Sequence, residues 1–318
     1  MAKLQSTEIV GVANRPATIC SNTMCLWFDT TLLRPMASYC GCGAGTWSAG
    51  GALITARFSL AGAGTQNVGL AINGRNQSGT SFSCTEEYNG TSWSAGGALA
   101  NARYASAGAG TQNEGLVMGG AVVGVGVASC TEEYNGTSWS AGGALIVARF
   151  QLAGAGTQNA GLAIGATSGN CTEEYNGTSW STGGGLITAR GYLAGAGSQN
   201  AGLAISGLVS AAISCTEEYN GTSWSAGGAL ITGRCALAGA GTQNVGLATG
   251  GSTTSVAGNT EEYNGTSWSA GGQLITARNQ LAGAGIQNEG LVFGGFSGGQ
   301  VSCTEEYNKS ITIVDCIL

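Results

Sequence analysis

The sequence predicts an all-β protein in which six similar units of four short strands close into a ring, and three repeated features support this prediction. A tryptophan recurs six times, at spacings of 46, 46, 41, 44 and 44 residues. An arginine follows each tryptophan by ten residues, and a pair of adjacent glutamates recurs with the same rhythm. The residues concerned are Trp47, Trp93, Trp139, Trp180, Trp224 and Trp268; Arg57, Arg103, Arg149, Arg190, Arg234 and Arg278; and Glu86/Glu87, Glu132/Glu133, Glu173/Glu174, Glu217/Glu218, Glu261/Glu262 and Glu305/Glu306.

Four short strands fit each repeat, as the second copy illustrates. The expected strands are Ser106–Thr111, Glu114–Met118, Ser129–Tyr134 and Ser138–Ala141, with turns at Gln112-Asn113 and Asn135-Gly136. Asn-Gly is the strongest two-residue hairpin signal, because both central residues of that turn need a positive φ. The first strand, Leu-Ala-Gly-Ala-Gly in most copies, has little bulk and suits the inner strand of a β-propeller. The tryptophan is expected on the outer strand, where the wedge between blades widens.

The ends of the repeat array predict how the ring closes. Trp47 has no glutamate pair before it, and the last glutamate pair has no tryptophan after it. The strand around Trp47 is therefore expected to complete the blade that begins near Leu281, since closure removes free sheet edges. The expected organisation is an attachment segment with a β-hairpin at 1–45, a six-bladed propeller at 46–308 and a closing strand or tail at 309–318. A seventh, partial blade built from residues 26–48 is the alternative.

Composition and charge limit the classes of partner. Apolar residues reach 43%, charged residues are 9%, and glycine makes up 58 of 318 residues, so the chain is expected to fold as short strands and tight turns. A net charge of −6 argues against nucleic acid and against anionic membrane surfaces. The first residues lack the apolar region of a secretory signal, and no apolar run approaches a membrane span. We therefore expect a soluble protein without a cleaved signal, without membrane insertion and without nucleic acid as a partner.

Each repeat combines a Gly-Gly after the second strand, Glu-Glu-Tyr on the third, Trp on the fourth and Arg before the next blade. Gly119-Gly120, Glu132-Glu133-Tyr134, Trp139 and Arg149 show this pattern, which resembles the kelch repeat over residues 46–308. Two features depart from that family: the interval from Tyr134 to Trp139 is short, and several diglycines are broken, at Asn73-Gly74, Gly165-Ala166 and Ser206-Gly207.

The N-terminal stretch Leu26-Trp27-Phe28-Asp29-Thr30-Thr31 is similar to hairpins of tailed-bacteriophage fibre and appendage proteins. The TEEYNGTSW units resemble kelch-type propellers of such virion proteins. This resemblance implies a virion protein assembled in the host cytoplasm, with residues 1–45 bound to other virion proteins, and it allows a homo-oligomer.

Repetition separates structural residues from candidates for function. A catalytic pair is needed once and not six times, so one glutamate of each pair is expected to partner the arginine of its own or an adjacent blade. The six tryptophans are interpreted as structural for the same reason. A ring of carboxylates that binds a cation is the alternative. The Asn-Gly-Thr sequences are explained by hairpin chemistry rather than by glycosylation; they begin at Asn89, Asn135, Asn176, Asn220 and Asn264.

Five of the eleven cysteines occupy one repeat position and are interpreted as packed free thiols of a reducing compartment: Cys84, Cys130, Cys171, Cys215 and Cys303. Cys20, Cys25, Cys40 and Cys42 could bind zinc, but their spacing matches no standard site and the chain has no histidine. No metal or other cofactor is therefore predicted.

The copies differ mainly in two connections. The Gln-Asn and Asn-Gly-Thr turns are nearly invariant and belong on one face of a propeller, which we call the uniform face. The two residues after each arginine, and the segment between the second and third strands, vary and belong on the opposite face, which we call the variable face. A constraint from the fold alone acts alike on every copy, whereas a ligand needs different groups at each blade. Unconstrained drift of exposed loops is the alternative.

Aromatic and amide side chains on the variable face suit a glycan or a polar protein epitope, and the kelch resemblance implies binding through the same two loops. The candidate ligand-binding residues are Phe58, Ser59, Tyr104, Phe150, Gln151, Tyr192, Asn279, Gln280, Arg75, Asn76 and Gln77.

A non-enzymatic role is favoured. Without histidine, the usual Ser-His-Asp, Cys-His and His-metal sites are absent. Outside the repeated pairs only five acidic residues remain for a glycosidase pair: Glu8, Asp29, Glu114, Glu289 and Asp315. The leading hypothesis is a virion appendage that binds a host-surface glycan or protein. An intracellular adaptor for protein partners and a purely structural decoration module are the alternatives.

Overall fold

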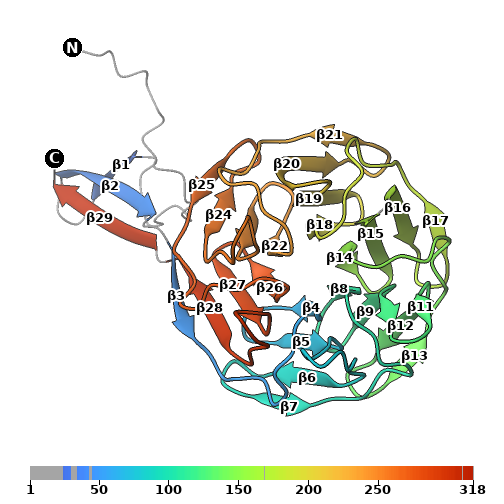
Figure 1. The fold of residues 1–318 in the computed structure, drawn as a ribbon. Helices are drawn as coiled ribbons and strands as arrows, with labels where there is room; N and C mark the ends of the chain where they lie inside the picture. Colours follow the sequence, from blue (N-terminus) through green and yellow to red (C-terminus); the bar gives the residue numbers. More distant parts are fainter. Residues whose placement is uncertain (1–23, 30–33, 43–44, 168, 310, 318) are drawn as a thin grey trace. The chain divides into compact units, whose positions relative to one another are not determined.

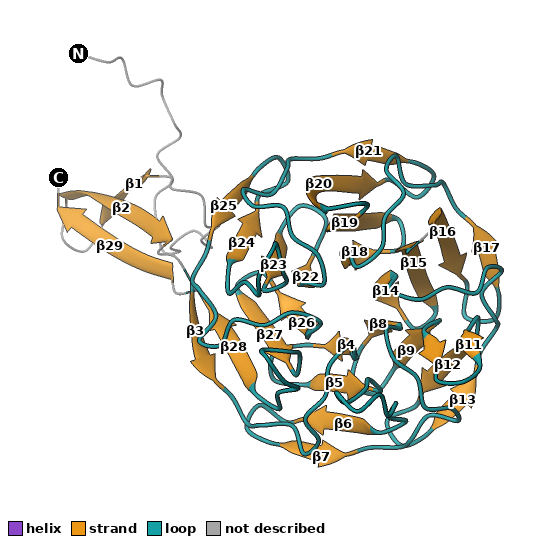
Figure 2. Ribbon diagram, viewed as in Figure 1, coloured by secondary structure: helices purple, strands orange, loops and turns teal. Residues whose placement is uncertain are grey.

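The computed structural model describes residues 24–29, 34–42, 45–167, 169–309 and 311–317. Its contacts divide the chain into two units, residues 1–45 together with 309–318, and residues 46–308. The larger unit consists of six four-stranded antiparallel sheets arranged around a centre, a six-bladed β-propeller (Figures 1 and 2). Within the part of the chain that is described, no helix is long and apolar enough to cross a membrane. The predicted all-β propeller is confirmed.

We number the blades I to VI along the chain, and blades I to V each run in chain order from an inner to an outer strand. Blade I contains β4 (Ala61–Gly64), β5 (Gly69–Ile72), β6 (Thr85–Tyr88) and β7 (Trp93–Ala95); blade II contains β8 (Ala107–Gly110), β9 (Gly115–Met118), β12 (Thr131–Tyr134) and β13 (Trp139–Ala141). Blade III contains β14 (Ala153–Thr157), β15 (Ala160–Ala166), β16 (Gly169–Tyr175) and β17 (Trp180–Thr182); blade IV contains β18 (Ala194–Ser198), β19 (Ala201–Leu208), β20 (Ala212–Tyr219) and β21 (Trp224–Ala226). Blade V contains β22 (Ala238–Gly241), β23 (Gly246–Thr249), β24 (Thr260–Tyr263) and β25 (Trp268–Ala270). A small hairpin, β10 (Ala121–Val122) with β11 (Gly126–Val127), extends blade II.

Blade VI closes the ring. Its first three strands are β26 (Ala282–Ile286), β27 (Glu289–Phe293) and β28 (Thr304–Asn308), and its outer strand is β3 (Thr46–Ala49) from the start of the array. Tyr307 lies opposite Trp47 in this antiparallel pair. The predicted pairing of N- and C-terminal strands is therefore confirmed, and the alternative of a seventh partial blade is wrong, because β3 belongs to blade VI.

The smaller unit contains a three-stranded sheet in the order β1 (Met24–Asp29), β2 (Arg34–Cys42) and β29 (Ile311–Ile317). β1 and β2 pair antiparallel, so the strands of the expected N-terminal hairpin are present. The strand expected to close the ring from 309–318 instead pairs with β2, and closure depends on β3 and β28. Cys20 lies outside the described residues, and so do the side chains of the other three N-terminal cysteines.

A ring of glycines allows the six inner strands to approach one another. A Cβ added to the first glycine of each inner strand would lie 2.5 to 2.9 Å from the carbonyl oxygen of the equivalent glycine in the preceding blade. These glycines are Gly62, Gly108, Gly154, Gly195, Gly239 and Gly283. Because the obstructing atoms belong to the backbone, no side-chain movement could relieve the clash, and the low bulk of these strands follows from this packing.

Three hydrogen bonds repeat at each boundary between blades. The outer-strand tryptophan donates its indole N–H to a threonine hydroxyl of the preceding blade at 2.9 to 3.0 Å. The third-strand tyrosine donates its hydroxyl to the second glutamate of the preceding blade at 2.5 to 2.7 Å. The turn glutamine donates its amide to the carbonyl of the preceding blade's tyrosine at 2.6 to 2.8 Å. Thus Trp, Tyr, Gln and the second Glu of the repeat all join adjacent blades.

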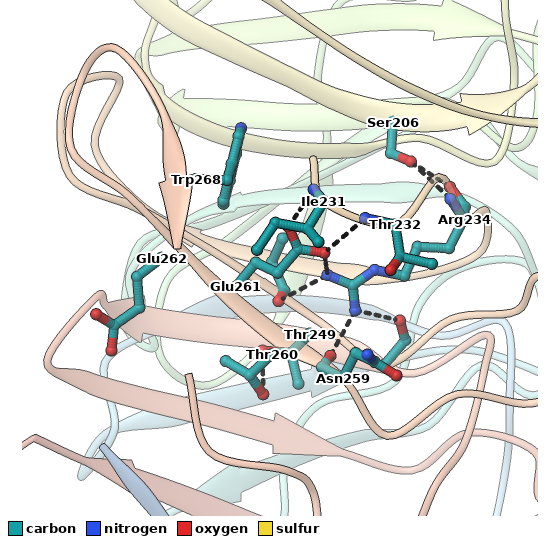
Figure 3. A network of polar contacts seen from close by, with 12 residues as sticks. Ser206, Ile231, Thr232, Arg234, Thr249, Asn259, Thr260, Glu261, Glu262 and Trp268 are labelled. Carbon is teal, nitrogen blue, oxygen red and sulfur yellow. Dashed lines mark hydrogen bonds and ion pairs between the residues drawn. The ribbon is translucent and has the colours of Figure 1, made fainter. Parts of the chain in front are cut away.

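The first glutamate of each pair binds the arginine of its own blade, with both side chains almost fully buried. Figure 3 shows the arrangement in blade V, where Glu261 accepts from Arg234 at 2.9 Å and from the backbone N–H of Ile231 at 2.7 Å. Glu262 points away from this network, toward blade VI, where Tyr307 donates to it. Burial lowers the pKa of Arg234, and the charge of Glu261 opposes that shift. The predicted pairing of arginine with one glutamate is present in all six blades.

The Gln-Asn turns of the uniform face have the predicted two-residue form where Thr157 pairs with Ala160, Ser198 with Ala201 and Ile286 with Glu289, whereas the Asn-Gly turns depart from it. In the Asn89-Gly90 turn of the first copy, Gly90 has a positive φ and Asn89 does not. The Asn89 side chain accepts hydrogen bonds from the backbone N–H groups of Thr91 and Ser92 at 3.0 and 2.9 Å. The asparagine thus shapes a longer turn through its side-chain oxygen. The interpretation of the repeated cysteines as packed thiols is wrong in part: all five are free, but four are half-buried and Cys171 is exposed.

Candidate functional site

The two variable segments of each blade lie side by side. In blade I, Phe58 follows the repeat arginine and forms an antiparallel bridge with Arg75, which follows the second strand. Equivalent bridges join the two segments in blades II, IV, V and VI. The invariant turns also lie together, since a Cβ on Gly90 would meet Asn67 of the neighbouring turn at 3.3 Å. The chain therefore has one uniform and one variable face, as the repeat pattern predicts.

The second residue after each repeat arginine forms a ring around the propeller axis, which we call the axial mouth. All six residues have a positive φ between 50° and 57°, and each donates its backbone N–H to the carbonyl of the equivalent residue in the preceding blade at 2.8 to 2.9 Å. The six bonds close on themselves: Ser59, Ala105, Gln151, Tyr192, Ala236 and Gln280. This closed ring holds a left-handed conformation that is otherwise uncommon for residues other than glycine, and it fixes six side chains around one opening.

The mouth opens into a pocket of about 80 Å³, lined below by leucines in five blades and by Ser106 in blade II. Around the ring, Gln151 lies three blades from Gln280, and Ser59 lies three blades from Tyr192. The Ser59 hydroxyl donates to Gln280 Oε1 at 2.5 Å. Thr167 donates to Gln151 Oε1. Both glutamine acceptors are thus engaged by hydroxyls, and the Gln151 amide also donates to the Tyr192 phenol, which leaves the Gln280 NH₂ group as a donor at the mouth.

Tyr192 reaches other members of the mouth through its phenol. Burial raises the pKa of Tyr192, whereas the positive charge of Arg75 and a hydrogen bond from Gln151 lower it. Tyr192 is half-buried, and Gln151 and Arg75 are close enough to its phenol to influence its pKa.

Arg75 lies beside the mouth, between blades I and II. Its guanidinium carbon is 4.3 Å from the centre of the Tyr104 ring and 5.0 Å from that of Phe58. Both distances are within the range of a cation–π contact. Phe58 is itself buried and packs edge-on against Phe296 at 5.4 Å. Phe58 therefore supports Arg75 from below, and the expectation that Phe58 offers an exposed aromatic platform is wrong.

The remaining candidate residues are spread over the variable face. Asn76 caps its own loop by accepting from the backbone N–H of Thr80 at 2.8 Å, and Gln77 is exposed at the tip of that loop. Asn279 is half-buried, with its Oδ1 atom buried and without a hydrogen-bond partner. Phe150 is half-buried. The structure thus gathers Ser59, Gln151, Tyr192 and Gln280 at the mouth with Arg75 and Tyr104 beside them, and leaves the others in outer positions.

Sequence reasoning missed two buried polar residues next to the mouth. Asn73 occupies the position of the first glycine of the diglycine, with a φ of 52°, and donates to the Ser106 hydroxyl at 2.5 Å. Ser106 occupies the position that is leucine in the other five copies. Taken alone, each residue is one departure from the repeat consensus. The signal that could have identified them is that both departures fall on facing loops of blades I and II.

Sequence reasoning also missed an exposed aliphatic side chain that recurs in five of the six copies. It follows the conserved leucine on the connection between blades, and it is 58 to 64% exposed wherever it is isoleucine. The isoleucines are Ile54, Ile146, Ile187, Ile231 and Ile275, and blade II has Ala100 instead. Their backbone N–H groups bind the buried glutamates, so the fold requires the position but not the aliphatic side chain.

No family model matches this chain. A comparison with curated proteins also gave no match. Family and function therefore rest on the residues themselves. Among the side chains that the structure describes, no three His, Cys, Asp or Glu residues gather closely enough to hold a metal ion.

Proposed function

We propose that this chain is a non-enzymatic binding protein of a virion appendage, and that its variable face binds a host-surface glycan. The observation that carries the proposal is the contrast between the two faces. On the uniform face the repeated Gln and Asn side chains are used in turns and blade contacts. At the axial mouth, six side chains of different chemistry are held around one opening by a closed ring of backbone bonds.

A glycan suits the chemistry of this mouth. Sugar hydroxyls both donate and accept hydrogen bonds, and the mouth offers amide, hydroxyl and phenol groups in Gln151, Gln280, Ser59 and Tyr192. Tyr104 and Tyr192 add flat aromatic surfaces of the kind that carry binding energy at interfaces. The pocket of about 80 Å³ has room for one small polar group of a ligand but not for several side chains of a protein partner, which favours a ligand that presents single polar groups.

The virion context is supported by the sequence pattern alone. The kelch-like repeat, the TEEYNGTSW units and the Leu26–Thr31 stretch are similar to those of tailed-bacteriophage appendages. In that setting residues 1–45 would attach the propeller to other virion proteins, and the propeller would carry the contact with the host.

The experiment compares the full chain with two triple variants on an array of bacterial-surface glycans. The mouth variant carries Gln151→Ala, Tyr192→Ala and Gln280→Ala. The control variant carries Val68→Ser, Val245→Ser and Ile286→Ser, at exposed residues of the uniform face. Loss of roughly two to three mouth contacts should weaken binding at least about tenfold, whereas the control should bind as the parent chain does.

Equal loss in both variants would contradict the assignment to the variable face. If no glycan binds but a soluble protein is captured saturably through the mouth residues, the intracellular adaptor is favoured instead. If neither binds, the decoration module is favoured.

A further inference from the structure

Several departures from the repeat fall in one sector of the variable face, between blades I and II, although the first glycine of the diglycine is also replaced in blade IV, by Ser206. Asn73 replaces the first glycine, Ser106 replaces a leucine, and Asn101 stands where the other copies have threonine or valine. Arg75 occupies a position that holds Ala, Thr, Leu, Ser or Phe elsewhere. The hydrogen bond from Asn73 to Ser106 joins two of these residues across the blade boundary, so the sector differs from the other five as a unit.

Arg75 differs from the other arginines of the propeller in its charge environment. The six repeat arginines are each paired with a buried glutamate. Among the residues that the structure describes, Arg75 has no ion pair, and this separates it from the repeat arginines; its Nε atom is buried without a hydrogen-bond partner, as it is in five of those six. A guanidinium that is partly removed from water and lacks an anion is poised to bind one, since planar carboxylates match its two parallel N–H donors.

Neighbours of Arg75 line two hollows, although Arg75 itself lines neither. On its inner side it is bridged to Phe58, which is followed by Ser59 of the axial mouth. On its outer side it is bridged to Ser81, which lines a second hollow of about 430 Å³. The Tyr104 ring contacts the Arg75 guanidinium, and its chain neighbours Ala105 and Ala102 line the mouth pocket and the outer hollow. An extended ligand could therefore run from the axis outward and pass over Arg75.

The lining of the outer hollow combines polar groups with apolar surface, which suits a sugar because a sugar ring has polar edges and apolar faces. It contains hydroxyl and amide groups from Ser78, Thr80, Ser81 and Asn101, and the apolar side chains of Ala102, Val122 and Val123. At the inner end, Gln280 presents an NH₂ donor, because the Ser59 hydroxyl already occupies its oxygen. The Arg75 guanidinium and the amide donor at the inner end can bind a carboxylate, and the hydroxyl groups of the outer hollow can bind the hydroxyls of a sugar ring.

We infer that the sector between blades I and II binds an acidic sugar of an extended glycan, with Arg75 pairing its carboxylate and Tyr104 packing against the ring. This inference rests on the proposed function, because it assigns a ligand class to one sector of the same face. Arg75 is a specificity residue in this account: it selects charged over neutral sugars.

The test uses the full chain and an array of oligosaccharides that end in galacturonate, glucuronate or sialic acid, together with their methyl esters and neutral counterparts. Arg75→Met removes the charge and keeps the length of the side chain, and Arg75→Lys keeps the charge and removes the planar donor pair. Val245→Asp is the control, because it also lowers the net charge by one but lies on the uniform face. Thermal unfolding of each variant checks that it is folded.

We expect acid-ended glycans to bind the parent chain at least tenfold more tightly than their methyl esters. Arg75→Met should abolish that preference, Arg75→Lys should reduce it, and Val245→Asp should leave it unchanged. Preference retained in Arg75→Met, or lost equally in Val245→Asp, would overturn the inference. Binding of neutral glycans alone through the mouth would also overturn it while leaving the proposed function intact.

Two competition arms separate the sources of negative charge. Inorganic phosphate and a peptide with a free C-terminal carboxylate are added against the bound acidic glycan. Competition by galacturonate and not by these two supports a sugar site, whereas equal competition by either would overturn the sugar assignment. Absence of any glycan binding by the parent chain would refute the proposed function itself.

Discussion

The glycine ring at the axis gives the sharpest prediction about stability. In Gly108→Ala, the new methyl group would lie 2.5 Å from the carbonyl oxygen of Gly62 and 3.1 Å from its carbonyl carbon and nitrogen. All three obstructing atoms are backbone atoms of blade I, so the inner strands of blades I and II must move apart. Overpacking of a close-packed interior costs about 1–3 kcal/mol, and a clash with backbone on a closed ring belongs near the upper end.

For a domain of this size, about 3 kcal/mol corresponds to a fall in Tm of roughly 6–12 °C. Gly169→Ala is the matched control, because its Cβ would meet nothing closer than Cys171 at 3.9 Å and the glycine does not have a positive φ. That substitution should leave Tm unchanged or raise it slightly, since alanine restricts the unfolded chain. Differential scanning calorimetry of both variants provides the measurement. A Gly108→Ala protein that unfolds within about 1 °C of the Gly169→Ala protein would refute the account of the axis, the threshold being well below the shift expected for 1 kcal/mol.

Three further predictions concern the repeated contacts. Burial and the hydrogen bond to the carboxylate of the preceding blade raise the pKa of Tyr88 to about 12. The stabilisation from this hydrogen bond should therefore be complete below pH 10 and lost as the pH rises to about 12. Phenolate absorbance and urea midpoints across this range check the prediction, and ionisation of Tyr88 near pH 10 without loss of stability would contradict it. Glu86→Gln leaves Arg57 buried without a counter-charge and should lower the free energy of unfolding in urea by about 3–5 kcal/mol, whereas Arg57→Met combined with Glu86→Leu should recover most of that loss. A single variant that is no less stable than the double variant would argue against the buried Arg57–Glu86 ion pair. Cys171 is exposed, whereas Cys84 is half-buried and burial raises its pKa, so brief alkylation followed by peptide mapping should modify Cys171 first, and faster modification of Cys84 would show that the environments are misassigned.

The repeated part of the structure could be predicted from the sequence because each repeated residue has a repeated partner. Trp47 has no glutamate pair before it, and the last glutamate pair has no tryptophan after it. These two incomplete repeats were enough to predict that β3 pairs with β28. The same logic predicted the pairing of Arg57-type residues with one glutamate, because neither charge is stable alone in the interior.

The repeat pattern could not, however, reveal which atoms meet between blades. The Gln66-type residue reads as a turn former, yet its amide binds the carbonyls of the preceding blade. The Asn-Gly pair predicts a two-residue hairpin, yet the Asn89 side chain organises a longer turn. Both differences arise because the repeat shows which side chains recur but not which backbone groups they bind, and those hydrogen bonds decide the local geometry.

The candidate site was predicted in outline and not in detail. The contrast between invariant and variable connections located the face, since it depends only on which strands each loop joins. The burial of Phe58 depends on Phe296, a single residue of another blade, and the Asn73–Ser106 bond depends on two exceptions that meet only when the ring is assembled. Residues that occur once carry no periodic signal, so their neighbours become visible only in three dimensions.

Hydrogen–deuterium exchange with the glycan that gives the strongest array signal tests most directly whether the variable face is the binding surface. Peptides that contain the axial mouth and residues 73–83 should exchange more slowly when the glycan is bound, while peptides that contain the Gln-Asn and Asn-Gly-Thr turns should not change. Protection confined to the turns of the uniform face, with unchanged exchange at Ser59, Gln151, Tyr192 and Gln280, would contradict the assignment.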